Sequence, residues 1–453
     1  MKTMKAENLI KNNIFAIPVG DFLRKDMNEA YMIYAPLAGI EFIADADYVI
    51  RLDAGIGREC DISDDQDEII FQLLGTPERK ISSVLKNAFE NSNVLYVIPN
   101  YKCNFSCSYC YAAAGRSSKE IDAEDVQNTV SLFIEKKEPT DESPLRIVFI
   151  GGGEPMLSWS VVHKTITNAK ETASKFNKKI AFTIITNGSI LTDSMLQFIR
   201  QYDIRINVSF EILKEIQNSQ RGSYDVVVQN IHKLLKNAVK VNLRATITEL
   251  NVALMPQMIE ETTAKFSGVK SVFFETVTLP QNDSATKMDQ FLENYYKWFK
   301  IADECAEKNN LTLFNSQLVA MDHIGENFCS GLITLTPERT FTLCPCFSSP
   351  NEKYYEQNTI GCIRNGRIDI AEEKYQDILN QHSCRKTMCR TCFAKYNCGG
   401  GCIYRNLIYS KETQKVICQH TREYVRYSLF KRICKNYRAQ MKRDMISDLL
   451  EKL

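Results

Sequence analysis

Short apolar runs, separated by stretches of helical periodicity, constrain the fold more than any other feature of this chain. They occupy residues 94–99, 146–150, 180–186, 204–209, 241–248 and 271–277. Apolar strands that alternate with helices are typical of a parallel sheet covered by helices. These units are fewer than the roughly eight of a complete barrel. The sequence therefore predicts an α/β fold whose centre is a partial (β/α)6 barrel.

The most unusual motifs directly follow the first three of these strands. Cys103 comes just after the first, a Gly-Gly-Gly-Glu-Pro sequence after the second, and Thr186-Asn187-Gly188 after the third. In parallel α/β folds, functional groups gather at the carboxyl ends of the strands. The motifs therefore predict a single site at that edge of the sheet.

Composition excludes several classes of function. The chain has 56 basic and 55 acidic residues, for a net charge of +1. This balance argues against a broad basic face that binds nucleic acid. No apolar run approaches the roughly 20 residues of a membrane helix, and the first residues lack the apolar region of a signal peptide. We therefore expect a soluble, cytoplasmic protein with no nucleic-acid or membrane partner.

The 16 cysteines are unevenly distributed. Three of them lie within residues 103–110, and eleven lie within residues 329–434. Clustered cysteines in a reducing cytoplasm bind metals more often than they form disulfides. The sequence therefore predicts metal centres in two separate regions of the chain.

The first cluster, Cys103, Cys107 and Cys110, has the spacing C-x3-C-x2-C. A cubane iron–sulfur cluster takes four thiolates, so three leave one iron open to another ligand, whereas a structural zinc site needs four closed ligands. At this point the sequence resembles the radical S-adenosylmethionine (SAM) superfamily. Tyr109 occupies the aromatic position of that family's signature.

The resemblance implies a set of SAM-binding residues. The glycine-rich loop would approach the methionine part of SAM, Glu154 would bind its amino group, and Arg221 would bind its carboxylate. The full set of implied cofactor-binding residues is Tyr109, Gly151, Gly152, Gly153, Glu154, Pro155, Asn187, Ser209 and Arg221. Many relatives read Ser-x-Asp-Gly after the fourth strand, but here the sequence is Ser209-Phe210-Glu211-Ile212. The missing glycine calls the local turn into question.

The resemblance also implies a one-electron reaction. A flavodoxin- or ferredoxin-type donor would reduce the cluster, which would pass an electron to the sulfonium of SAM. The resulting 5′-deoxyadenosyl radical would abstract hydrogen from an unactivated C–H bond. The cofactor supplies this chemistry, and the barrel positions it and excludes water.

The second cysteine region resembles the SPASM extension, which carries up to two auxiliary 4Fe–4S clusters in radical SAM enzymes that mostly modify peptides. The resemblance implies a distal cluster held by Cys389, Cys392, Cys398 and Cys418, and a nearer one held by Cys329, Cys344 and Cys402. A zinc ribbon is the alternative for one quartet.

Two positions depart from the SPASM pattern. A family cysteine six residues before Cys329 is His323 here, so the fourth ligand of the nearer cluster is His323, Cys346 or an open iron. The family's usual glycine five residues before Cys344 is Arg339.

The chain divides into a leading α/β module over residues 1–91, the barrel over 92–282, a helical linker over 283–322, the SPASM region over 323–420 and an amphipathic helix over 421–453. In the leading module, residues 31–34 and 48–52 predict strands and residues 67–74 a helix. Peptide-modifying radical SAM enzymes often carry a leader-recognition module, a winged-helix-like fold that binds peptide by strand addition, so the resemblance implies this role for residues 1–91.

The resemblance favours an oxidoreductase that matures a ribosomal precursor peptide by forming a thioether, a carbon–carbon crosslink or a related modification. One alternative is an anaerobic sulfatase maturase, which makes formylglycine, but those relatives have an Asp base where Pro345 stands here. An alternative of another class is a non-catalytic iron–sulfur carrier or scaffold.

Overall fold

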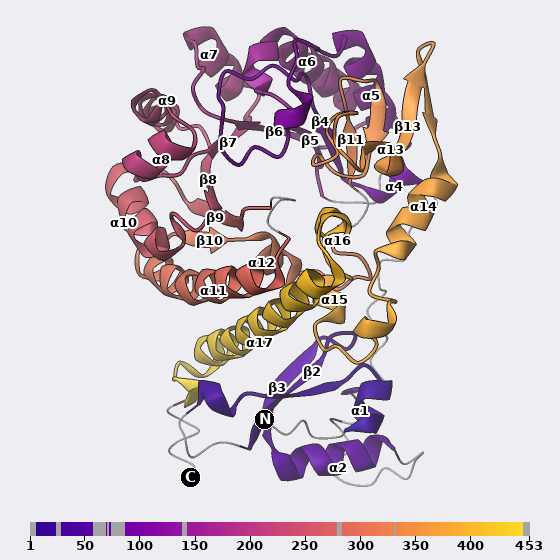
Figure 1. The fold of residues 1–453 in the computed structure, drawn as a ribbon, viewed down its shortest axis with the longest axis vertical. Coiled ribbons are helices and arrows are strands. Elements are labelled where there is room, and N and C mark those ends of the chain that lie inside the picture. The colour runs from indigo at the N-terminus through magenta and orange to yellow at the C-terminus, as the bar shows by residue number, and fades with distance from the viewer. Residues whose placement is uncertain are drawn as a thin grey trace.

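The structure, a computed structural model, describes residues 6–23, 29–57, 69, 72–73, 87–137, 143–278, 283–329 and 332–446. Within these residues the strands form a three-stranded sheet and an eleven-stranded sheet (Figure 1). Among the described helices, none has both the length and the apolar character needed to span a membrane.

The large sheet contains all the strands expected for the barrel. They are β4 (Val94–Val97), β5 (Leu145–Phe149), β6 (Ile180–Thr186), β7 (Arg205–Ser209), β8 (Val241–Ile247) and β9 (Ser271–Thr276). Each pairs in parallel with the next in the order of the chain. The predicted parallel α/β arrangement is confirmed.

The sheet extends beyond these strands on both sides. Strand β10 (Thr312–Phe314) pairs in parallel with β9, and β11 (Ile333–Leu335) pairs in parallel with β4. Antiparallel strands β12 (Thr340–Thr342), β13 (Thr359–Arg364) and β14 (Arg367–Ile370) follow β11. Because β10 and β14 are separate edges, the barrel is open, as predicted. Strands β11–β14 belong to the predicted SPASM region, so that region shares a sheet with the barrel.

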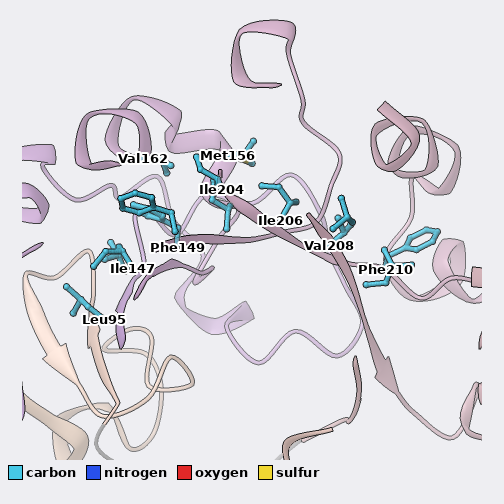
Figure 2. Close-up of a cluster of buried hydrophobic side chains, with 14 of the residues drawn as sticks. Leu95, Ile147, Phe149, Met156, Val162, Ile204, Ile206, Val208 and Phe210 are labelled. Carbon is cyan, nitrogen blue, oxygen red and sulfur yellow. The ribbon is translucent and has the colours of Figure 1, made fainter. Parts of the chain in front are cut away.

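Helices cover the outer face of this sheet. The bounds of the helices that follow its strands are α5 (Ala123–Lys136), α6 (Trp159–Lys175), α7 (Asp193–Gln201), α8 (Lys214–Gln220), α9 (Tyr224–Lys236), α10 (Met255–Lys265) and α11 (Ala285–Lys308). Figure 2 shows Ile147 and Phe149 of β5 near Val162 of α6, within one buried apolar cluster. Residues on the alternate side of each strand line the inside of the open barrel.

The remaining helices are short, except the last. They are α1 (Glu7–Lys11), α2 (Ala46–Ile56), α4 (Ala88–Asn91), α12 (Ser316–Ala320), α13 (Tyr355–Asn358), α14 (Glu372–Gln381), α15 (Lys395–Cys398), α16 (Ile403–Ile408) and α17 (Lys411–Met441). Single 3-10 turns occupy Gly20–Phe22, Ala113–Gly115, Pro155–Ser158, Val252–Leu254 and Thr387–Cys389. The predicted helical linker consists of α11 and α12, but the sequence did not reveal β10 between them.

The leading module is an antiparallel sheet of β1 (Phe15–Pro18), β2 (Ala30–Ala35) and β3 (Ile40–Asp45), in that order. The strand expected over residues 31–34 is present in β2, but the strand expected over 48–52 is wrong. Asp45 caps α2 there by accepting from the backbone N–H of Tyr48 at 2.7 Å. Val49 and Leu52 are buried at helical spacing. Most of the helix expected over 67–74 lies outside the described residues.

The last helix links the leading module to the rest of the molecule. It begins at Lys411, earlier than the predicted 421, because Ser410 accepts a hydrogen bond from the N–H of Thr413 and caps it. Val425 and Leu429 of α17 are buried against one face of the small sheet, while α1 and α2 cover the other. Figure 1 shows α17 running beside β2 and β3.

Candidate active site

The cysteine loop after β4 and the glycine loop after β5 are in direct contact. The backbone N–H of Glu154 donates to the carbonyl of Lys102 at 2.6 Å. A Cβ atom on Gly153 would collide with that carbonyl oxygen, and one on Gly152 would collide with the ring of Tyr101. Only glycine allows so close an approach. The loops predicted to share a site therefore form one continuous surface.

The Cys110 sulfur lies close enough to Cys103 and Cys107 for its charge to raise the pKa of both thiols. Burial raises the pKa of Cys103 and Cys107, while the guanidinium of Arg221 opposes the rise at Cys107. Arg221 Nη1 lies 3.7 Å from the Cys107 sulfur. Among the described residues, no three Cys, His, Asp or Glu side chains are already arranged around a common point as metal ligands are.

Glu154 joins the ends of β5 and β6. Its buried carboxylate accepts from the N–H of Met156 at 3.0 Å, the hydroxyl of Thr186 at 2.6 Å and the N–H of Asn187 at 2.7 Å. Burial raises the pKa of Glu154, and these bonds oppose that rise. A carboxylate has about four acceptor positions, so most of them serve to position the loops. Contact with an amino group of SAM stays a prediction.

Asn187 connects the end of β6 to the cysteine loop. Its side-chain Nδ2 donates to Asn104 Oδ1 at 2.9 Å, and its side-chain Oδ1 accepts from the backbone N–H of Ser189 at 2.9 Å. Asn104 in turn donates to the hydroxyl of Ser189 at 2.9 Å. Asn187 therefore helps to fix the loop that contains Cys103 and Cys107.

Glu211, which follows β7, is the centre of a buried polar network that sequence reasoning did not include among the site residues. Its carboxylate accepts from the hydroxyl of Tyr109, from Arg221 Nε at 2.8 Å and from the N–H of Thr246 at 3.1 Å. The Arg221 guanidinium also stacks 5.2 Å from the centre of the Tyr109 ring. Burial raises the pKa of Glu211, and the Arg221 charge opposes that rise.

The turn after β7 is strained where relatives have a glycine. Ser209 ends β7 beside Arg244 of β8. Ile212 is fully buried and adopts a φ of +66°. A β-branched residue rarely takes this left-handed conformation. The backbone therefore keeps the turn that the missing glycine had put in doubt.

Four cysteines come together from the segment before β11, the segment after β12 and the N-cap of α16. They are Cys329, Cys344, Cys346 and Cys402, and their thiols influence one another's ionisation. The N–H of Cys346 donates to the sulfur of Cys344 at 3.4 Å. The described contacts link none of these thiols to His323, whose N–H donates to the carbonyl of Ala320 at 3.1 Å. The structure therefore brings Cys346, rather than His323, to the other three.

A second group consists of Cys389, Cys392, Cys398 and Cys418, the last on α17. Burial raises the pKa of all four thiols. Cys384, which the sequence analysis did not assign, lies near Cys389. Burial raises its pKa to about 11. It stands five residues before Cys389 in the sequence.

Two cavities lined by described residues are relevant to the barrel. One of about 340 Å³ lies against the cysteine loop and is lined by residues that include Tyr109, Gln220, Thr248, Phe291 and Tyr409. Its size is within the range of small-molecule sites. The other, of about 830 Å³, lies at the opposite ends of the strands.

Comparison with known protein families identifies the barrel. Residues 97–266 match the Radical SAM superfamily. The chain contains a radical SAM domain. The match covers the cysteine loop, the glycine loop and the strands from β5 to β8.

Curated relatives match only part of the chain. The radical SAM cyclopropyl synthase TigE of Paramaledivibacter caminithermalis is 26% identical over 27% of this chain and 28% of its own length. The chain spans 65% and 58% of two uncharacterised archaeal relatives, from Methanocaldococcus jannaschii and Methanothermobacter thermautotrophicus.

Solved structures share the fold over more of the chain. Native anSMEcpe with bound AdoMet and Kp18Cys peptide has a TM-score of 0.56 and 15% identity, covering 75% of this chain and 98% of that one. Streptococcus suis SuiB bound to the precursor peptide SuiA has a TM-score of 0.50 and 14% identity, covering 88% and 95%. The likeness therefore extends past the radical SAM domain into the cysteine-rich region.

Proposed function

We propose that this protein cleaves SAM reductively at a 4Fe–4S cluster and uses the resulting radical to modify a peptide. The observation that carries the proposal is the docking of the glycine loop on the loop of Cys103, Cys107 and Cys110. Three thiols suit an iron–sulfur cluster with one open iron. The glycines beside them allow the two loops to pack directly against each other.

The groups around the cluster then have separate tasks. When bound, the cluster and SAM supply the electron transfer and the C–H abstraction. Arg221, held by Glu211, places a positive charge beside Cys107 and would bind the carboxylate of SAM. Glu154 and Asn187 fix the loops, and the cavity beside Tyr109 has room for part of the cofactor. A flavodoxin- or ferredoxin-type protein would provide the electron.

The two cysteine groups beyond the barrel suit auxiliary 4Fe–4S clusters, which take four thiolates each. The distal group offers Cys389, Cys392, Cys398 and Cys418. The nearer group offers Cys329, Cys344 and Cys402, with Cys346 as the fourth ligand in place of His323. Ligands from Cys329, before β11, to Cys418 of α17 would then cross-link the C-terminal part of the chain, so metal binding would contribute to its folding.

A peptide substrate is supported by the likeness to SuiB and anSMEcpe, whose structures contain peptides. Within the described residues, strand β3 is an edge of the leading sheet, because it pairs with β2 on one side only. Peptides add to such edges through main-chain hydrogen bonds. Residues 1–91 would therefore hold a leader peptide. A synthetic leader should inhibit modification of the full precursor; undiminished modification at saturating leader would contradict this role.

The experiment that tests the proposed function is SAM cleavage by anaerobically reconstituted protein. With dithionite it should yield 5′-deoxyadenosine and methionine, and the protein should contain about eight to twelve irons, as two or three cubanes require. A non-catalytic carrier would bind iron without cleaving SAM. Mass spectrometry of a precursor encoded beside the gene then separates the formylglycine product, for which Pro345 replaces the expected base, from a crosslink.

A further inference from the structure

The larger cavity is lined by positive charges, although the chain as a whole is nearly neutral. It measures about 830 Å³, and the described residues that line it include Arg146, Arg205, Lys240, Arg244 and Lys270 but no acidic residue. The chain as a whole has a net charge of only +1. A cavity lined by charges of one sign attracts ligands of the opposite sign. We refer to it as the basic chamber.

The basic chamber lies inside the barrel. On β7 and β8, side chains two residues apart point to the same face. Arg205, Asn207 and Ser209 therefore share the inner face of β7, and Asn242 and Arg244 share that of β8. The step from Arg205 to Ser209 is about 13 Å at roughly 3.3 Å per residue. The chamber therefore begins at the amino ends of the strands and points toward the candidate active site.

Arg244 is the deepest cation of the chamber. It is half-buried, and its guanidinium stacks 4.2 Å from the centre of the Phe273 ring. Burial lowers its pKa. Glu275, the acid that influences it, is bound to Arg405 at 3.2 Å and to the N–H of Ser316 at 3.0 Å. In the described part of the chain, no carboxylate lies within ion-pair distance of Arg244.

The other cations lie at the mouth. Arg146, Arg205 and Lys270 are exposed and form no ion pair with any described residue, whereas Lys240 pairs with Asp203 at 2.6 Å. The wall between them is polar, because Asn242 donates to Asn207 at 3.0 Å and accepts from Ser271 at 2.7 Å. An anionic, extended ligand could contact the mouth and Arg244 together.

We propose that the basic chamber binds carboxylate side chains of an acidic segment in the substrate peptide, an inference that rests on the proposed function. Guanidinium groups bind carboxylates in bidentate geometry. Charge complementarity of this kind fixes register and discourages wrong partners. The acidic segment enters at the amino ends of the strands and places a neighbouring residue near the cysteine loop.

The test measures binding of fluorescein-labelled hexaglutamate and hexaglutamine to reconstituted holoenzyme with SAM, by fluorescence anisotropy. Hexaglutamate should bind at least about tenfold more tightly, and the difference should shrink with salt. Arg205→Gln at the exposed mouth and Arg244→Met inside should each weaken hexaglutamate binding by about fivefold or more. Lys170→Gln, an exposed lysine on α6 outside the chamber, should leave it unchanged.

Three outcomes would overturn the inference while SAM cleavage stays normal. They are equal binding of the two peptides, equal effects of Arg205→Gln and Lys170→Gln, or displacement of hexaglutamate by equimolar pyrophosphate, which would make the chamber a phosphate site. Absence of SAM cleavage in the wild-type holoenzyme would instead overturn the proposed function. Because Arg205 is exposed, its variant remains informative if Arg244→Met does not fold.

Discussion

Arg221 and Glu211 form a buried ion pair at 2.8 Å beside the cysteine loop. The exposed fractions of their side chains are 11% and 0%. Burying two charges is costly unless each is paired and hydrogen-bonded, and here Tyr109 and the N–H of Thr246 complete the carboxylate's bonds. The ion pair therefore connects the turn after β7, which contains Glu211, to the Cys107 sulfur, which lies beside Arg221.

Glu211→Gln should destabilise the protein strongly, by roughly 3 kcal/mol or more, because it leaves the Arg221 charge buried without its partner. Thermal unfolding of the reconstituted protein measures the effect. The matched control is Lys214→Gln, which breaks the exposed pair with Asp225 and should cost at most about 1 kcal/mol. Equal melting temperatures for the two variants would contradict the importance of the buried pair.

Cys346→Ser should lower the iron content by up to about four atoms per chain, because the nearer auxiliary cluster loses a thiolate. His323→Ala should leave the iron content unchanged. Cys434→Ser, on α17 against the leading sheet, serves as a cysteine control. Iron analysis and electron paramagnetic resonance of the reduced proteins provide the readout. A loss of iron with His323→Ala and not with Cys346→Ser would reverse the assignment.

Glu352 should make stability depend on pH. Burial raises its pKa to about 7 from an ordinary value near 4.5. The folded state therefore holds this proton more tightly than the unfolded state, so stability falls as pH rises from about 4.5 through 7. The melting temperature of Glu352→Gln minus that of wild type should therefore be larger at pH 8 than at pH 5. Glu356→Gln, on the exposed side of α13, should show no such trend.

The barrel strands were predictable because each is an apolar run between helical stretches, and the strands place the motifs at one edge. Strand β10 was not, since Thr312–Phe314 is too short to show a period. The strand expected over residues 48–52 failed for a related reason. A five-residue run that begins with an aromatic and two β-branched residues fits either period, and the cap at Asp45 favours the helix.

The site was predictable where a motif carried its own chemistry, as with Cys103 and the glycine loop. Glu211 was harder to place, because its role depends on Tyr109 and Arg221, which approach it only in the folded chain. Cys346 was left open beside His323 for the same reason. The sequence gives spacing along the chain, while the choice between two ligands depends on which side chain the fold turns toward the others.

Both positions where the sequence lacks an expected glycine keep a left-handed backbone. Ile212 has a φ of +66° and Arg339 a φ of +60°. Arg339 lies in the turn between β11 and β12 and pairs with Asp125 at 2.8 Å. Side chains at such angles cost roughly 1–2 kcal/mol, so the surrounding packing must hold them. At Ile212 the left-handed conformation is stabilised by burial, because its side chain is fully enclosed.

Replacing Ile212 with alanine and with glycine separates the strain from the burial. Both variants lose the apolar side chain, so both should be less stable than wild type by roughly 2–5 kcal/mol. At an ordinary position glycine is less stable than alanine by about 0.5–1 kcal/mol. Here only glycine adopts the left-handed turn freely, so Ile212→Gly should be more stable than Ile212→Ala by about 1 kcal/mol. Denaturant unfolding measures the free energy of unfolding of the two variants. If Ile212→Ala were the more stable, the turn would have relaxed once the isoleucine was removed.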